Sequence, residues 1–168
     1  EEATQNFDLI TYDKGASVLR MLEHYLGAEK FRNGIRVYIR KHCEGNTVAA
    51  DLWEALSAAS GEPVEKIARA WITQEGFPLV RLRSVTQSGK NYLELRQERF
   101  RAYATPSAKS KARPKASRWP IPWVGKIYTN SGKSRVEKHL LTQARGLHEI
   151  SGAIRCVYGN SEEAGFVR

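Results

Sequence analysis

Apolar residues in the first 76 positions follow the three-to-four-residue spacing of amphipathic helices. This spacing runs through four segments: residues 8–26, 28–43, 47–60 and 63–76. Glycines follow or close these segments, as is common where helices end. In them we expect four sets of buried side chains: Val18, Leu22 and Tyr25; Phe31, Ile35, Tyr38 and Ile39; Val48, Leu52 and Leu56; Val64, Ile67, Ala68 and Trp71. The pattern predicts four short helices with tight connections.

From residue 77 the period changes to the strict alternation of β-strands. Val80 and Leu82 alternate with Arg81 and Arg83, and the turn residues 87–90 lead into a second alternating run. Three further strand candidates follow, at residues 121–128, 135–141 and 153–158. Several short strands at this spacing predict a small antiparallel β-sandwich.

The change of period divides the chain into a helical part, residues 1–76, and a sandwich part, residues 77–168, which together make an α+β fold. The 168 residues suffice for one ordinary domain or two small ones. The helical part carries 9 basic and 12 acidic side chains, so the net charge of +9 comes from the sandwich part, which carries 18 and 6. A surface this basic is typical of proteins that bind nucleic acid or an acidic partner.

A loop from residue 104 to residue 118 has no acidic member and concentrates part of this charge. Its basic residues are Lys109, Lys111, Arg113, Lys115 and Arg118. Trp119 and Trp123 follow at once, and basic residues beside aromatic rings are typical of single-stranded nucleic acid binding. The alternation from Trp119 to Trp123 favours instead the start of a strand with both rings buried, beside a solvated loop. We prefer this second interpretation and keep nucleic acid as the alternative.

Two cysteines, Cys43 and Cys156, lie far apart in the sequence, which predicts free buried thiols rather than a disulfide framework. No run of about 18 uncharged apolar residues occurs, so no membrane partner is expected. The first residues have neither the basic end nor the apolar stretch of a signal peptide. We therefore expect a soluble chain, and the absence of a visible export signal is compatible with a cytoplasmic location.

The histidines do not form a zinc-binding motif. A zinc peptidase needs two histidines one helical turn apart, because that placement directs both imidazoles to one metal. His148-Glu149 provides the first half of such a motif, but Gly152 stands where the second histidine must be. The other histidines, His24, His42 and His139, are isolated in sequence and are expected at the surface or at helix ends. By its motifs alone, the chain is not a complete enzyme.

Six sequence segments carry a resemblance to a known family. In order they are Phe7 to Leu19, Gly45-Asn46-Thr47 leading to Asp51-Leu52-Trp53, Trp71 to Val80, Gln97 to Phe100, Trp119 to Pro122, and Asn160 with Gly165 to Arg168. They cover nearly the whole chain, which resembles the gluzincin zinc aminopeptidases of the alanyl, puromycin-sensitive and tricorn-interacting types. The resemblance implies that residues 1–76 are the end of a thermolysin-like catalytic domain and that residues 77–168 are the β-sandwich domain behind it.

The resemblance also implies a chemistry. In such enzymes a zinc-bound water attacks the first peptide bond of a peptide substrate, and a tyrosine hydroxyl stabilises the oxyanion that forms. Tyr12 stands at the position that matches this tyrosine, and it is the only catalytic residue that the resemblance places in this chain. The small residues 15–17 are expected to let another element approach the helix beside it.

The family's zinc ligands and substrate-binding segment are absent from this sequence, which predicts that the chain alone binds no zinc and is inactive. The expected partners are peptide substrates, an upstream catalytic half and a downstream helical domain. Two alternatives stay open: a non-enzymatic basic module that binds nucleic acid or an acidic partner, and a scaffold that has lost the catalytic half. Val167 replaces the tyrosine common in the family, and the loop at 104–118 is more basic than is typical.

Overall fold

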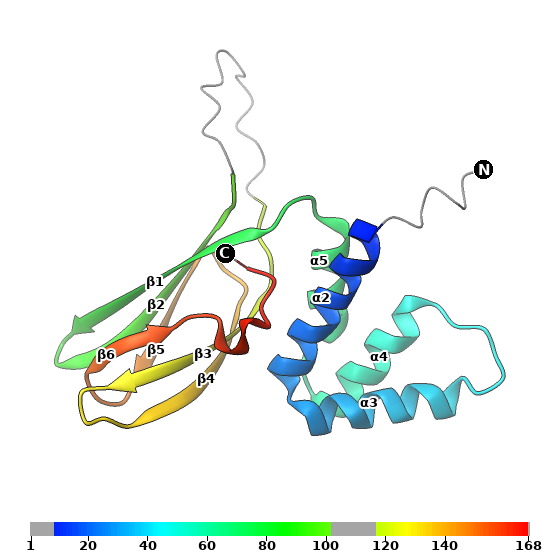
Figure 1. Cartoon of the computed structure of the whole chain (residues 1–168), viewed down its shortest axis with the longest axis horizontal. Coiled ribbons are helices and arrows are strands. Elements are labelled where there is room, and N and C mark those ends of the chain that lie inside the picture. The colour runs from blue at the N-terminus through cyan, green and yellow to red at the C-terminus, as the bar shows by residue number, and fades with distance from the viewer. Residues whose placement is uncertain (1–8, 102–116, 168) are drawn as a thin grey trace, which may run out of the picture.

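The structure is a computed structural model that describes residues 9–101 and 117–167 (Figure 1). Its helices are α2 (Leu9–Leu26), α3 (Ala28–Lys41), α4 (Ala49–Ser60) and α5 (Val64–Thr73), which confirms the four predicted from the spacing of apolar residues. Gly27 and Gly61 follow α2 and α4 with positive φ angles of 89° and 75°. Glycine adopts this conformation without steric cost, so these residues allow the sharp changes of direction between helices. None of these helices is long and apolar enough to cross a membrane.

Within the described residues, six strands form two antiparallel sheets of three. The strands are β1 (Pro78–Gln87), β2 (Lys90–Arg99), β3 (Ile121–Thr129), β4 (Ser134–Leu141), β5 (Arg145–Ile150) and β6 (Ile154–Tyr158). The first sheet has the order β1-β2-β5 and the second has the order β4-β3-β6. A short 3-10 helix, η1 (Ser161–Glu163), follows the last strand. The predicted α+β class is confirmed.

The β1-β2 hairpin closes where the sequence predicts a turn. Gln87 pairs with Lys90, which leaves Ser88 and Gly89 as a two-residue turn. Their φ angles are 51° and 75°, and two positive φ angles give a turn whose twist matches that of the strands beside it. The turn therefore fixes the register in which Leu82 lies opposite Leu95.

The central strand of the second sheet, β3, is covered on both faces. Every residue of β3 is buried or half-buried, unlike the residues of β4 and β6. One face of β3 meets α2, where Met21 and His24 line a small cavity with Pro122 and Val124. The other face packs toward the first sheet. Among the helices, α2 thus lies against the sandwich, whereas α3 and α4 extend away from it (Figure 1).

One hydrophobic core runs through the helices and both sheets. Trp71, near the end of α5, connects the two parts. Its ring lies 6.4 Å from that of Trp119 and 6.1 Å from that of Phe166, measured between centroids. Its Nε1 donates a hydrogen bond to the carbonyl oxygen of Pro120 at 3.0 Å. The predicted inward set on α5, which includes Trp71, is fully buried.

Two of the burial predictions on the helices are wrong, and four predicted residues are only half-buried: Phe31, Ile35, Tyr38 and Leu52. Val48 is 65% exposed because it occupies the extended N-cap position of α4, before the buried face of that helix begins. Ile39 is 58% exposed because no element covers that side of α3 in the described residues. Tyr38 is only half-buried, and its hydroxyl lies 2.7 Å from the Thr47 hydroxyl.

Both cysteines are exposed, which contradicts the prediction of buried thiols. Cys43 lies in the turn after α3. Cys156 lies on β6, where strand alternation turns its neighbour Val157 toward the core and Cys156 away from it. Neither cysteine forms a disulfide, as the sequence predicts.

Candidate functional site

Tyr12 lies near the start of α2, and its side chain is 58% exposed. The N-terminal end of α2 lies beside the C-terminal end of α5 (Figure 1). Lys14 joins the two helices there, because its ammonium lies 3.5 Å from the carbonyl oxygens of both Ile72 and Gln74. The helix turn that carries Tyr12 is thus held at a defined place on the molecular surface. A tyrosine hydroxyl placed in this way can donate a hydrogen bond to a ligand.

The expected close approach beside Tyr12 is not made by the described residues. A Cβ built at Gly15 would meet no atom within 4 Å. Gly34 on α3 differs from Gly15 in this respect. A Cβ built at Gly34 would lie 2.8 Å from the side chain of Leu56 and 3.0 Å from the Cα of Leu56. The small residue that allows two helices to approach is therefore Gly34, between α3 and α4.

The other end of α2 is fastened to the sandwich. Lys138 of β4 donates to the carbonyl oxygens of His24 and Tyr25 at 3.2 and 2.9 Å. A cation at the last carbonyls of a helix satisfies groups that have no partner within the helix and complements the helix dipole. Sequence reasoning missed this contact, since Lys138 stands more than 110 positions from its partners.

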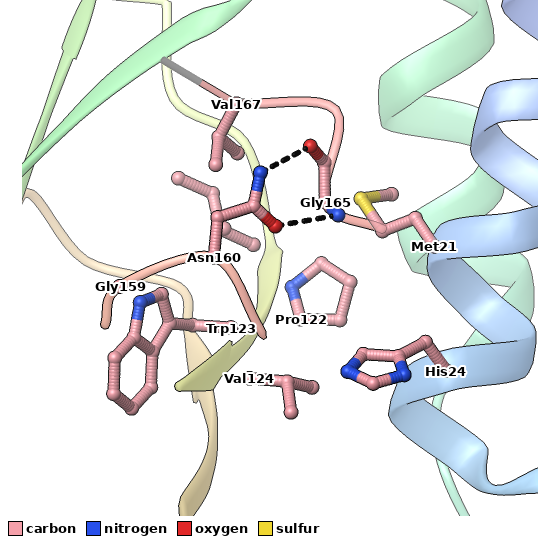
Figure 2. A pocket seen from close by; sticks show the side chains of 10 residues that line it. Met21, His24, Pro122, Trp123, Val124, Gly159, Asn160, Gly165 and Val167 are labelled. Carbon is pink, nitrogen blue, oxygen red and sulfur yellow. Dashed lines mark hydrogen bonds between the residues drawn. The ribbon is translucent and has the colours of Figure 1, made fainter. Parts of the chain in front are cut away.

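The segment that follows β6 lies over the contact between α2 and the sandwich. Figure 2 shows Asn160 with hydrogen bonds to both backbone polar groups of Gly165: its amide nitrogen donates to the carbonyl oxygen at 3.1 Å, and its side-chain oxygen accepts from the N–H at 2.8 Å. A Cβ at Gly165 would lie 2.9 Å from that side-chain oxygen, so the pair needs glycine. Asn160 and Gly165 therefore serve to fold the segment back beside Met21 and His24 of α2.

His148 lies on β5 and not on a helix, so the half motif His148-Glu149 is not part of a zinc-binding helix. His139 lies half-buried on β4, so the expected place at the surface or at a helix end is wrong for this residue. Its ring stacks on that of His148 with centroids 3.7 Å apart, and the ring of Trp123 lies nearly parallel to it at 5.8 Å. The two histidines come from strands of different sheets, which the connection between β4 and β5 brings together. The spacing of residues in the sequence does not predict this pair, because β5, which carries His148, was not among the predicted strands.

Burial favours the neutral form of both histidines. Burial lowers the pKa of His139 below its usual 6.5, and the nearby His148 lowers it further, while Glu137 acts in the opposite direction. Burial likewise lowers the pKa of His148, again against Glu137. Glu137 lies 3.8 Å from His139 but is itself paired with Arg135. Within the described residues, neither histidine Nε2 atom has a hydrogen-bond partner.

This arrangement predicts a loss of stability in mild acid. Because the folded pKa values lie below the unfolded value of 6.5, the unfolded chain binds more protons as the pH falls below 6.5. The free energy of unfolding, measured with denaturant from about pH 7.5 down to about pH 5.5, should therefore decrease. The variant His148→Gln, which removes one titrating ring and the repulsion on the other, should flatten this dependence. An equal slope in both proteins would contradict the prediction.

Trp119 and Trp123 are buried, with exposed fractions of 0% and 2%, which confirms the preference for core rings over base-stacking rings. Most of the basic loop lies outside the described residues, and of its members only Ser117 and Arg118 are described. Across residues 9–101 and 117–167, no group of three or more His, Cys, Asp or Glu side chains is placed to hold a metal ion.

Comparison with known proteins gives consistent results over the whole chain. The model of the peptidase family M1 domain matches residues 1–71. The chain is 43% identical over 133 residues to tricorn protease-interacting factor F2 of Thermoplasma volcanium. The matched segment covers 79% of the chain and 15% of that relative. It is 34% identical to aminopeptidase M1 of Arabidopsis thaliana over 99% of the chain and 19% of the relative. It is 36% identical to probable aminopeptidase 2 of Sulfurisphaera tokodaii over 100% of the chain and 19% of the relative. The chain thus spans less than a fifth of the length of these relatives.

Proposed function

The chain belongs to the peptidase M1 family of gluzincin aminopeptidases, and from this premise we propose that the protein that carries it removes N-terminal residues from peptides. The observation that carries the proposal is the family match at residues 1–71, which includes α2 with its exposed Tyr12. The sandwich match supports it, because relatives named aminopeptidases align over the rest of the chain.

In this proposal Tyr12 stabilises the oxyanion of the tetrahedral intermediate. Three observations support the role: the phenol is exposed, it stands in the segment from Phe7 to Leu19 that resembles the family, and Lys14 fixes its helix turn against α5. A positioned donor works because it is already oriented when charge develops on the substrate oxygen. Exposure suits this task, since the substrate must reach the hydroxyl.

Zinc would supply the activated water in this chemistry, but the described residues do not fit a zinc site, since none of them form a ligand group. No catalytic step is therefore assigned to a metal within this chain. We place the zinc ligands, and with them the upstream catalytic half, in the much longer protein that the lengths of the relatives indicate. A downstream helical domain is part of the same proposal.

The division at residues 76 and 77 is likewise a proposal, with residues 1–76 completing a catalytic domain and residues 77–168 forming the sandwich domain. The change from helix to strand between Thr73 and Pro78 supports it. A cytoplasmic location belongs to the proposal as well and rests on the family resemblance alone.

The test is hydrolysis of an aminoacyl amide by the full-length protein. The coding frame before Glu1 should encode a His-Glu-x-x-His helix with a glutamate after it. The full-length protein should hydrolyse the amide, lose activity when a chelator removes the metal, and regain it with zinc. The metal-loaded 168-residue chain is the control, and we expect it to be inactive. Hydrolysis by this chain alone, or an inactive zinc-loaded full-length protein, would contradict the proposal.

A further inference from the structure

A broad, open groove of about 610 Å³ lies at the end of the β1-β2 hairpin that is distant from its turn. Four arginines line it: Arg81, Arg99, Arg101 and Arg118. Leu79 and Phe100 supply apolar surface between them. A hollow that combines cationic walls with apolar surface is suited to a ligand that carries both negative charge and apolar groups.

The charge of the groove is only partly neutralised. Glu98 pairs with Arg81 at 2.7 Å, and Glu75, which is 93% exposed, lies 3.8 Å from Arg99. Arg101 and Arg118 pair with no carboxylate of the described residues, and both are exposed. The residues between Arg101 and Arg118 in the sequence cannot supply a carboxylate partner, because positions 102–116 contain no aspartate or glutamate.

Outside the groove, two arginines of the first sheet are already occupied. Arg96 and Arg145 both bind the carboxylate of Glu94, whose side chain is only 3% exposed. The hydrogen bond from Arg96 is the main cause that holds the pKa of Glu94 below its usual value. Cations in such a cluster are internal partners of the fold. The third, Arg83, is exposed and pairs with no carboxylate of the described residues, so what distinguishes Arg101 and Arg118 is that they line a hollow and not that they lack a partner.

The rings near the groove argue against nucleic acid as the ligand. Single strands bind to aromatic rings that offer a free face for stacking bases. Phe100, the ring that lines the groove, is half-buried, and one of its faces is covered by Phe77, with centroids 4.9 Å apart and an interplanar angle of 17°. Trp119, which follows Arg118, is fully buried. What the groove offers is guanidinium groups beside apolar surface, which match carboxylates and apolar side chains of a polypeptide.

We propose that this groove is a docking site for an acidic segment of a partner protein, with aspartate or glutamate side chains on the arginines and apolar side chains between them. The interaction is independent of the aminopeptidase chemistry, since Tyr12 lies on α2 and contributes nothing to the groove. Because exposed arginines dominate it, the affinity should fall steeply as the salt concentration rises.

The experiment uses the 168-residue chain and a fluorescent peptide in which glutamate alternates with leucine. We expect binding at low salt that is lost at high salt. The double variant Arg101→Glu and Arg118→Glu should bind about tenfold more weakly or worse, because two attractive charges become repulsive. The matched control is the double variant Arg32→Glu and Arg36→Glu on α3, which changes the net charge equally at exposed positions outside the groove. Its affinity should stay within about twofold, since distant exposed charges are screened.

Three outcomes would overturn the proposal: no binding of the peptide at low salt, equal weakening by both double variants, or tighter binding of a single-stranded oligonucleotide that the groove variant abolishes. The last would assign the groove to nucleic acid. Circular dichroism and thermal unfolding of the groove variant should match those of the parent chain, because both replaced side chains are exposed.

Discussion

Replacement of Tyr12 by phenylalanine is expected to lower kcat of the full-length enzyme about a hundredfold to a thousandfold and to change KM little. The hydroxyl is proposed to bind an oxygen whose negative charge exists only in the transition state. Loss of such a donor removes about 3–4 kcal/mol of transition-state stabilisation and leaves the ground-state complex nearly intact. Steady-state kinetics with an aminoacyl amide separate the two parameters.

The same helix offers a matched control in Tyr25→Phe. Tyr25 is 8% exposed, and its hydroxyl donates to Glu62 at 3.2 Å. Burial, with help from Glu62, raises the pKa of Tyr25 to about 12, so this hydroxyl too is a neutral donor. It lies inside the helical part, more than three turns along α2 from Tyr12. Tyr25→Phe should cost some stability and leave kcat unchanged.

Three results would remove Tyr12 from the mechanism: unchanged turnover in Tyr12→Phe, an equal loss in Tyr25→Phe, or a rise in KM with kcat preserved. The last would mean that the hydroxyl binds substrate and transition state equally well. The thermal midpoint of Tyr12→Phe should be close to that of the parent protein, because a side chain that is 58% exposed contributes little packing.

The anchoring of α2 explains how a residue with so little cover can have a defined position. At one end Lys14 holds the helix to α5, and at the other Lys138 holds it to β4. Between them Val18, Met21 and Leu22 are buried, with exposed fractions of 2% or less. The backbone under Tyr12 is therefore fixed by the core and by both neighbouring elements, and the sandwich has a structural role in the proposed site.

The parts of the fold that repeat locally could be predicted from sequence. The spacing of Val64, Ile67 and Trp71 defines the buried face of α5, and Ser88-Gly89 lies where two alternating runs must turn. Val48 was placed wrongly because the 3.6-residue period continues through a residue that precedes the helix itself.

What depends on contacts between distant residues could not be predicted. β5 contains a glycine and two charged residues among its six, and it is a strand because β2 offers it a partner in register. The stacked pair of His139 and His148 follows from that pairing. The candidate site shows the same limit: periodicity predicts the helix that carries Tyr12, but only the family resemblance distinguishes this tyrosine from the others, and its role stays a prediction.

Replacement of Trp71 by alanine is expected to lower the free energy of unfolding by about 3–5 kcal/mol, the usual cost of removing a large buried ring. Trp71 is 1% exposed and contacts Trp119 and Phe166, so the cavity would open between the helices and the sandwich. The variant also leaves the carbonyl oxygen of Pro120 without the donor that satisfies it. Denaturant unfolding followed by circular dichroism measures the loss.

Two further variants show how much of this loss of stability comes from the missing hydrogen bond and whether it is specific to Trp71. Trp71→Phe keeps most of the packing but removes the donor, and an unsatisfied buried carbonyl costs about 1–3 kcal/mol. Ile72→Ala, one residue further on and 49% exposed, should change stability by less than about 1 kcal/mol. Because one core crosses both parts of the chain, the circular dichroism of the helices and the tryptophan fluorescence, to which Trp119 and Trp123 of the sandwich contribute, should be lost together within each protein, at a midpoint that differs from one protein to the next. Separate transitions for the two signals in the parent chain would show that the helical and sandwich parts are stable independently and that Trp71 does not couple them.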